Sequence, residues 1–137
     1  MDLASNPEEK PPTSNQTGTL AIDLGNTTTV VAFQNEKENL PCLLRLSPIS
    51  RVPGEIPTLV WRDKADHSSL LVGQQVIDHG LAGKDHSNLR KDFKRLIGSQ
   101  YQTGQSFCIS PEQAGELLIK QIWQLLPPNL DVKRLVL

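Results

Sequence analysis

The chain has 137 residues, of which 37% are hydrophobic and 21% charged, and its formal net charge is −1. This length fits about one globular domain, and the balanced charge argues against nucleic acid and against an anionic membrane surface as partners. The longest apolar runs are far too short to cross a bilayer, and the N-terminus lacks the pattern of a secretory signal, so we expect a cytoplasmic protein without a membrane partner.

The first segment of the chain is rich in proline, serine, asparagine and charged residues and nearly free of apolar ones. This composition predicts a disordered tail over residues 1–17, because such a segment cannot bury enough apolar surface to become ordered. Residues 18–137 are expected to fold. The apolar run over 134–137 looks like a strand that has just begun, and we expect the chain to be a truncated part of a longer domain.

A β-hairpin opens the predicted fold. Residues 20–24 alternate large apolar with small or polar side chains, which predicts a strand. Residues 27–33 are mostly β-branched and predict a second strand after a turn at Gly25. A third strand is expected over 40–46, and the prolines of 47–57 predict a loop. The chain therefore begins with an antiparallel meander.

Helices are expected mainly in the second half of the chain. Residues 58–61 and 70–73 read as short strands around a polar turn. The spacing of apolar residues predicts a helix over 88–97. A clearer helix follows Ser110, which can form a capping box, and it ends before two prolines that follow residue 126. Together these elements predict an α/β fold.

The segment over 22–29 carries the clearest chemical signal. One face of its strand presents Asp23 between two very small residues, so a ligand can approach closely. The Gly25 turn can aim backbone N–H groups at an anion, and the hydroxyls of Thr27, Thr28 and Thr29 add donors without charge. Because Asp23 would repel a phosphate, its presence points to a cation such as Mg²⁺ between them. A plain hairpin with an aspartate near its turn is the alternative.

A second candidate is the basic run over 90–95. From residue 84 to residue 95 there are five basic and two acidic side chains, a local charge of +3. Such a cluster on a helix can neutralise a phosphate, and the alternative is a solvated helix face without a ligand.

Several segments together resemble DnaK-type chaperones, the seventy-kilodalton heat-shock protein family. Residues 20–32 resemble the phosphate loop of these proteins, a loop that actin-like proteins and sugar kinases share, and 56–60 resemble their Thr-Pro-Ser strand. Residues 71–74 match their Val-Gly-Gln step and 93–98 their Lys-Arg-Leu-Ile-Gly helix end, two motifs that are more specific to the chaperones. Residues 110–113 lie where these proteins begin a helix.

The resemblance implies a ribonuclease-H-like, actin-like ATPase fold, of which this chain forms an incomplete first lobe. It implies ATP and Mg²⁺ as cofactors, hydrolysis that drives folding of unfolded client proteins, and co-chaperones as partners of the complete protein. Lys94 matches the catalytic lysine of the family. The positions that match its metal and phosphate-binding residues are Asp23 near the metal, and Gly25, Asn26, Thr27 and Thr28 along the phosphates.

Asn26 departs from the family, which usually has threonine there, although an amide can still donate a hydrogen bond. The second phosphate loop and the adenosine pocket of the family lie beyond Leu137, so we expect the chain alone to bind ATP weakly or not at all. A truncated or divergent relative that acts as a non-catalytic interaction module, or an inert fragment, is the alternative to a working ATPase. An actin-like or kinase relative is a further alternative.

Overall fold

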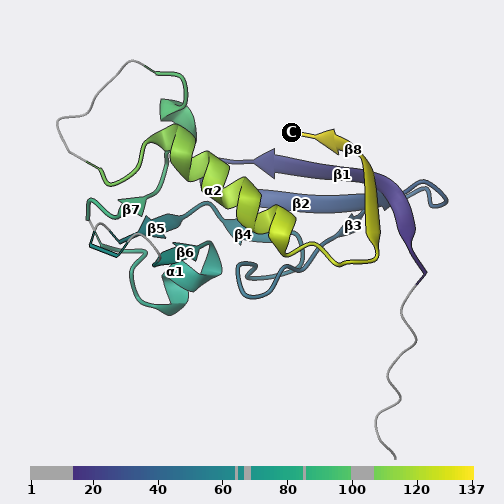
Figure 1. Cartoon of the computed structure of the whole chain (residues 1–137), viewed down its shortest axis with the longest axis horizontal. Helices are drawn as coiled ribbons and strands as arrows, with labels where there is room; N and C mark the ends of the chain where they lie inside the picture. The colour runs from purple at the N-terminus through teal and green to yellow at the C-terminus, as the bar shows by residue number, and fades with distance from the viewer. Residues whose placement is uncertain (1–13, 64, 67–68, 85, 100–106) are drawn as a thin grey trace, which may run out of the picture.

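The computed structural model describes residues 14–63, 65–66, 69–84, 86–99 and 107–137, which form two sheets and two α-helices (Figure 1). The first sheet contains β1 (Gln16–Leu24), β2 (Thr28–Asn35), β3 (Cys42–Leu43), β4 (Glu55–Pro57) and β8 (Leu130–Val136). The second contains β5 (Val60–Arg62), β6 (Leu70–Val72) and β7 (Leu89–Arg90). The helical elements are α1 (Gln74–Asp78), the 3₁₀ turn η1 (Lys94–Leu96) and α2 (Pro111–Gln124).

The predicted hairpin is confirmed, and it is the centre of the first sheet. β1 and β2 pair antiparallel, while β3 and β4 both pair with β2, and β8 runs parallel to β1 at the other edge. The third predicted strand shrinks to the two residues of β3, and β4 lies inside the segment predicted as a loop. The antiparallel meander β1–β2–β3 and the α/β class are thus as predicted.

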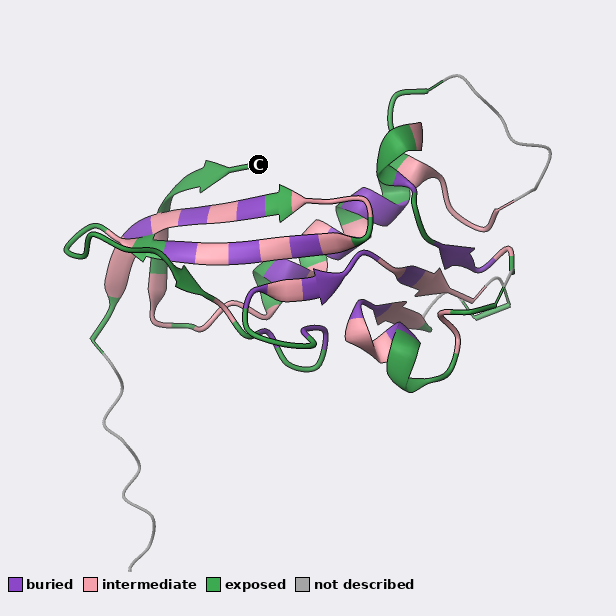
Figure 2. Ribbon diagram, turned by 180° about the vertical axis from the view of Figure 1, so that it is seen from behind, coloured by how far each residue is buried: buried purple, intermediate pink, exposed green. Residues whose placement is uncertain are grey.

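The alternating pattern of β1 and β2 places their apolar side chains in the core (Figure 2). Leu20 and Val31 are fully buried, and Ile22 and Phe33 are nearly so. They pack in one cluster with residues of α2, which crosses the sheet (Figure 1). Burial on one face fixes the register of the hairpin, since a slip by one residue would move every one of these side chains to solvent.

The helix predicted after Ser110 is confirmed as α2. The Ser110 side chain accepts a hydrogen bond from the Gln113 backbone N–H, and the Gln113 side chain accepts one from the Ser110 N–H, which completes the capping box. Ala114, Leu118 and Ile122 recur at helical spacing and are fully buried. The helix is therefore held by its cap at one end and by an apolar face along its length.

The helix predicted over 88–97 is wrong. Leu89 and Arg90 form β7, which pairs with β5, and Asp92 has a left-handed φ of 52° that interrupts any helix. Leu89 and Phe93 are both buried, as the apolar spacing required. A short apolar run is compatible with several backbone conformations, and here strand pairing with β5 decided between them.

The ends of the folded part differ slightly from the prediction. β1 begins at Gln16, so the last two residues of the predicted tail belong to a strand, while residues 1–13 lie outside the described part of the chain. The predicted final strand begins earlier, at Leu130. No helix in the described part of the chain is long and apolar enough to span a membrane.

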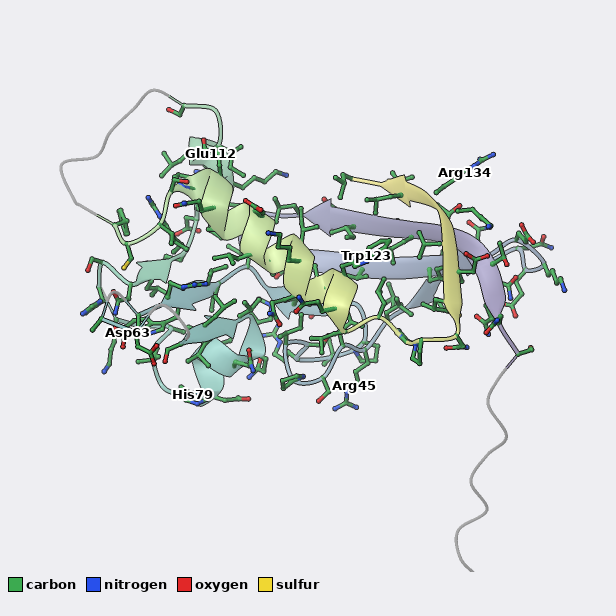
Figure 3. The ribbon with its side chains drawn as sticks, viewed as in Figure 1. Arg45, Asp63, His79, Glu112, Trp123 and Arg134 are labelled. Atoms are coloured by element: carbon green, nitrogen blue, oxygen red, sulfur yellow. The ribbon has the colours of Figure 1, made fainter. Side chains whose placement is uncertain are left out.

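Glu112 joins the start of α2 to the end of η1, and this contact predicts a loss of stability in acid. The Glu112 side chain is labelled at the start of α2 in Figure 3. Its carboxylate accepts a hydrogen bond of 2.9 Å from the Gly98 N–H, which lowers the pKa of Glu112. A lowered pKa stabilises the fold above the ordinary glutamate value of about 4.3, and this contribution is lost as the pH falls through the lower folded value. We expect hydrogen exchange to show that Gly98 loses protection below pH ~4. The Glu112→Gln variant should lack this pH dependence, and an identical profile in both proteins would contradict it.

Candidate functional site

The turn between β1 and β2 is fixed by hydrogen bonds to the segment that follows β4. The Thr58 hydroxyl donates to the Gly25 carbonyl (2.9 Å), and the Thr58 N–H donates to the Thr27 carbonyl (2.9 Å). The hydroxyls of Thr58 and Thr29 are also 2.9 Å apart and buried. The Thr29 hydroxyl is therefore used inside the protein, which contradicts its expected role as a phosphate donor. The backbone of the turn is held in one conformation.

Gly25 is required for space rather than for a left-handed conformation. Its φ does not lie in the left-handed region. A Cβ added at this position would lie 2.1 Å from the Thr28 carbonyl oxygen, a contact that the backbone cannot accept. The tight turn brings the side chains of Asn26, Thr27 and Thr28 to one place.

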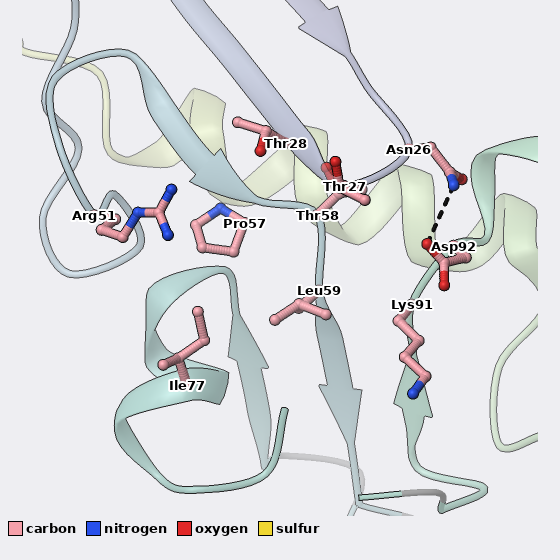
Figure 4. Close-up of a pocket in the computed structure, with 10 residues that line it drawn as sticks. All are labelled: Asn26, Thr27, Thr28, Arg51, Pro57, Thr58, Leu59, Ile77, Lys91 and Asp92. Carbon is pink, nitrogen blue, oxygen red and sulfur yellow. Dashed lines mark hydrogen bonds between the residues drawn. The ribbon is translucent and has the colours of Figure 1, made fainter. Parts of the chain in front are cut away.

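These three side chains line a cavity of about 360 Å³ (Figure 4). The opposite walls come from the segment after β4, from α1 and from the residues that follow β7. The remaining lining residues are Arg51, Pro57, Thr58, Leu59, Ile77, Lys91 and Asp92. The lining of the cavity is mainly apolar, and hydroxyl, amide, guanidinium and ammonium groups open onto it. These donors are the groups that suit a phosphate or another polyoxyanion.

The basic run over 90–95 does not form one charged face. Arg90 is buried: its Nε donates to the Ile109 carbonyl (2.8 Å) and its guanidinium lies 3.7 Å from the centre of the Phe107 ring. Burial lowers the pKa of Arg90, and the nearby charge of Glu112 opposes this shift. Lys91 reaches the cavity instead. Because the backbone changes from the strand β7 to a left-handed residue at Asp92 and then to the 3₁₀ turn η1, neighbouring side chains of the run point in different directions.

Asn26 and Asp92, which are 66 residues apart, meet at the edge of the cavity. Asn26 Nδ2 donates a hydrogen bond of 3.1 Å to Asp92 Oδ1 (Figure 4). The Asn26 Oδ1 atom is buried and has no hydrogen-bond partner among the described residues. An unsatisfied buried acceptor costs about 1–3 kcal/mol. The hydrogen bond to Asp92 therefore holds the Asn26 side-chain amide in a position where its Oδ1 atom has no partner.

The structure gathers part of the predicted site and leaves part of it aside. Asn26, Thr27 and Thr28 line one cavity, as the phosphate-loop prediction requires, and Gly25 shapes their turn. Asp23 is exposed and does not line that cavity, and neither does Lys94, which is exposed in η1. Their assigned roles at the metal and in catalysis stay predictions.

Four polar lining residues were not predicted as site residues. Thr58 lies in the segment that resembles the Thr-Pro-Ser strand, so the resemblance carried a signal for it. Lys91 and Asp92 belong to the basic run, but the expected helix hid their separate directions. No pattern in the sequence pointed to Arg51, which reaches the cavity from a loop. In the structure its guanidinium also forms an exposed ion pair of 3.4 Å with the Glu55 carboxylate.

Among the described residues, no group of three or more His, Cys, Asp or Glu side chains could hold a metal ion. A cation in this cavity would therefore have to share its ligands with a bound anion, as Mg²⁺ commonly does with phosphates. The one carboxylate in the lining is that of Asp92, which lines the same cavity as Thr27 and Thr28.

Compared with known proteins, the sequence matches no protein-family model, and no curated protein matches it significantly. The resemblance to DnaK-type chaperones therefore rests on the motifs of this sequence alone.

Proposed function

We propose that the cavity binds the phosphates of a nucleotide, and that the chain is the phosphate-binding part of an ATPase domain of the DnaK type with an actin-like fold. The observation that carries this proposal is the convergence of Asn26, Thr27 and Thr28 with Arg51 and Lys91 around one cavity. These residues come from distant parts of the chain and offer mainly donors. A plain hairpin turn would not need these two basic side chains from other segments of the chain.

The expected affinity is low. Arg51 and Lys91 are both exposed, and an exposed ion pair contributes only about 0.2–1 kcal/mol. These two contacts and the three neutral donors Asn26, Thr27 and Thr28, at about 0.5–1.5 kcal/mol each, sum to about 4 kcal/mol, which corresponds to a dissociation constant near 1 mM. A tighter complex requires further walls around the ligand, which the complete protein is proposed to supply together with the pocket for the base.

In the complete protein, ATP hydrolysis is proposed to drive the folding of client proteins with the help of co-chaperones, with Lys94 positioning the γ-phosphate and the attacking water. A second candidate is a relative that binds nucleotide without hydrolysing it. One observation favours this second candidate: Lys94 does not line the cavity, whereas Lys91 does.

The proposal predicts that two lysines three positions apart behave differently. Lys91 makes no ion pair within the described part of the chain, so its charge is free for a ligand. We expect Lys91→Ala to weaken binding of ATP and of tripolyphosphate about fivefold, because one cavity-lining charge is lost. Lys94→Ala removes the same charge outside the cavity. Its proposed role requires the walls that the complete protein supplies, so this change should leave binding by the present chain unchanged.

The measurement is a titration followed by NMR, which detects millimolar affinities residue by residue. Amide shifts should be largest over 26–28 and at residues 91–92. A titration with sodium sulfate at equal ionic strength is the control for unspecific anion binding. Equal losses in both variants, or shifts spread over the whole surface, would contradict the proposal.

A further inference from the structure

The strand β8 forms an open edge of the first sheet. It pairs with β1 on one side, and among the described residues no strand pairs with its other side (Figure 1). β8 covers seven residues, and its last two, Leu135 and Val136, are 46% and 54% exposed. A long edge strand with exposed apolar side chains is a template for pairing with another chain.

A bulge in β8 determines which of its residues share a face of the sheet. The register with β1 passes over Lys133, which is the additional residue of the bulge. Asp131 and Arg134 therefore lie on one face, although they are three positions apart. Leu130 and Leu135 lie on the other face, where β1 and β2 contribute to the core.

The charged residues of β8 form a self-complementary pattern. Asp131 lies in the first half of the strand and Arg134 in the second, and the Arg134 side chain points away from the molecule (Figure 3). Arg134 makes no ion pair within the described part of the chain. Charged residues on an edge strand usually oppose pairing. Here an antiparallel second copy of β8 would bring opposite charges together, whereas a parallel copy in register would bring like charges together.

We propose that two copies of this chain associate through antiparallel pairing of their β8 strands about a two-fold axis. Each Asp131 then lies opposite Arg134 of the other copy, and the same register places each Leu130 opposite Leu135 of the other copy on the core face. The two first sheets become one continuous sheet. This inference goes beyond the proposed function and does not depend on it, since none of these residues lines the phosphate cavity.

The expected dimer is weak. An interface made by one strand pair buries less than about 1,200 Å², the range of transient complexes. We therefore expect a dissociation constant on the order of 100 μM at low salt. Because its ion pairs are exposed, the dimer should dissociate further as the salt concentration rises.

The test reverses charges in the whole chain and measures the oligomeric state by sedimentation equilibrium. Asp131→Arg places like positive charges opposite each other, and Arg134→Asp places like negative charges there. Each variant alone should dimerise about tenfold more weakly than the wild type. Lys84→Glu is the control, because it reverses an exposed charge outside the first sheet and should leave the dimer unchanged.

An equimolar mixture of Asp131→Arg and Arg134→Asp should associate about as tightly as the wild type, because every pair in the mixed dimer again joins opposite charges. Recovery in the mixture also shows that neither variant lost its dimer by misfolding. A wild-type chain that stays monomeric up to about 1 mM overturns the inference and leaves the β8 edge to a different partner. A dimer that neither reversal weakens, or a mixture that does not recover, overturns it as well.

Discussion

Replacing Gly73 with alanine is expected to destabilise the fold by about 2–5 kcal/mol, because the change combines backbone strain with a steric clash. Gly73 follows β6 and precedes α1, and its backbone has φ 60° and ψ −125°. This is the geometry of the first central residue of a type II′ turn, a position dominated by glycine. Adopting a left-handed φ costs other residues roughly 1–2 kcal/mol.

The clash adds to this strain because the surroundings of Gly73 are rigid. A Cβ would lie 2.5 Å from the Ile49 carbonyl oxygen and 2.7 Å from the Ile56 side chain. The Ile49 carbonyl accepts a 2.8 Å hydrogen bond from the Gln74 N–H, and both isoleucines are fully buried. Neither can move away without disturbing the core, and overpacking of this kind costs about 1–3 kcal/mol.

Gly80→Ala is the matched control for Gly73→Ala. Gly80 has φ 69°, and nothing lies within 4 Å of an added Cβ. This variant should lose only the cost of backbone strain, about 1–2 kcal/mol. Urea unfolding of the two variants and the wild type, followed by circular dichroism, separates the two effects. Equal losses at both positions would mean that the contact with Ile49 and Ile56 has no energetic weight.

The elements with regular patterns could be predicted from the sequence, and they form the centre of the fold. The β1–β2 hairpin combines period-two alternation with a glycine turn, and α2 combines a capping box with apolar residues at helical spacing. In each case local preference and burial agree, so no tertiary information is needed. The resemblance pointed to the turn residues Asn26, Thr27 and Thr28, and the turn of this hairpin brings them to one cavity.

The second wall of the cavity could not be predicted, because it depends on contacts between distant segments. Strands as short as β3, β4 and β7 have no periodicity of their own, and they exist because β2 or β5 offers them a partner. The helix expected over 88–97 had the right apolar residues but the wrong backbone. That error hid Lys91 and Asp92, whose directions follow from an extended segment that pairs with β5 and then turns at a left-handed residue.

Phe93→Ala is expected to destabilise the fold by about 3–5 kcal/mol, the usual cost of truncating a buried phenylalanine. Phe93 is fully buried in the cluster that joins the first sheet to α2, and Gly115 of α2 lies close enough that a Cβ there would be 3.9 Å from its ring. Because Gly115 has no side chain, it cannot fill the hole that alanine leaves.

The Phe93→Ala change should also affect the cavity, because Lys91 and Asp92 immediately precede Phe93, the buried side chain that anchors their segment. We expect the backbone around Lys91 and Asp92 to open more often in Phe93→Ala, which hydrogen exchange over 89–93 can measure where the variant stays folded. Trp123→Ala is the control: it removes a larger side chain from α2, but Trp123 is 52% exposed and should cost below ~1 kcal/mol. Phe93→Leu, which nearly keeps the volume, should recover most of the stability. A larger decrease of the urea midpoint in Trp123→Ala than in Phe93→Ala would contradict this prediction, because the half-exposed Trp123 would then stabilise the fold more than the buried Phe93.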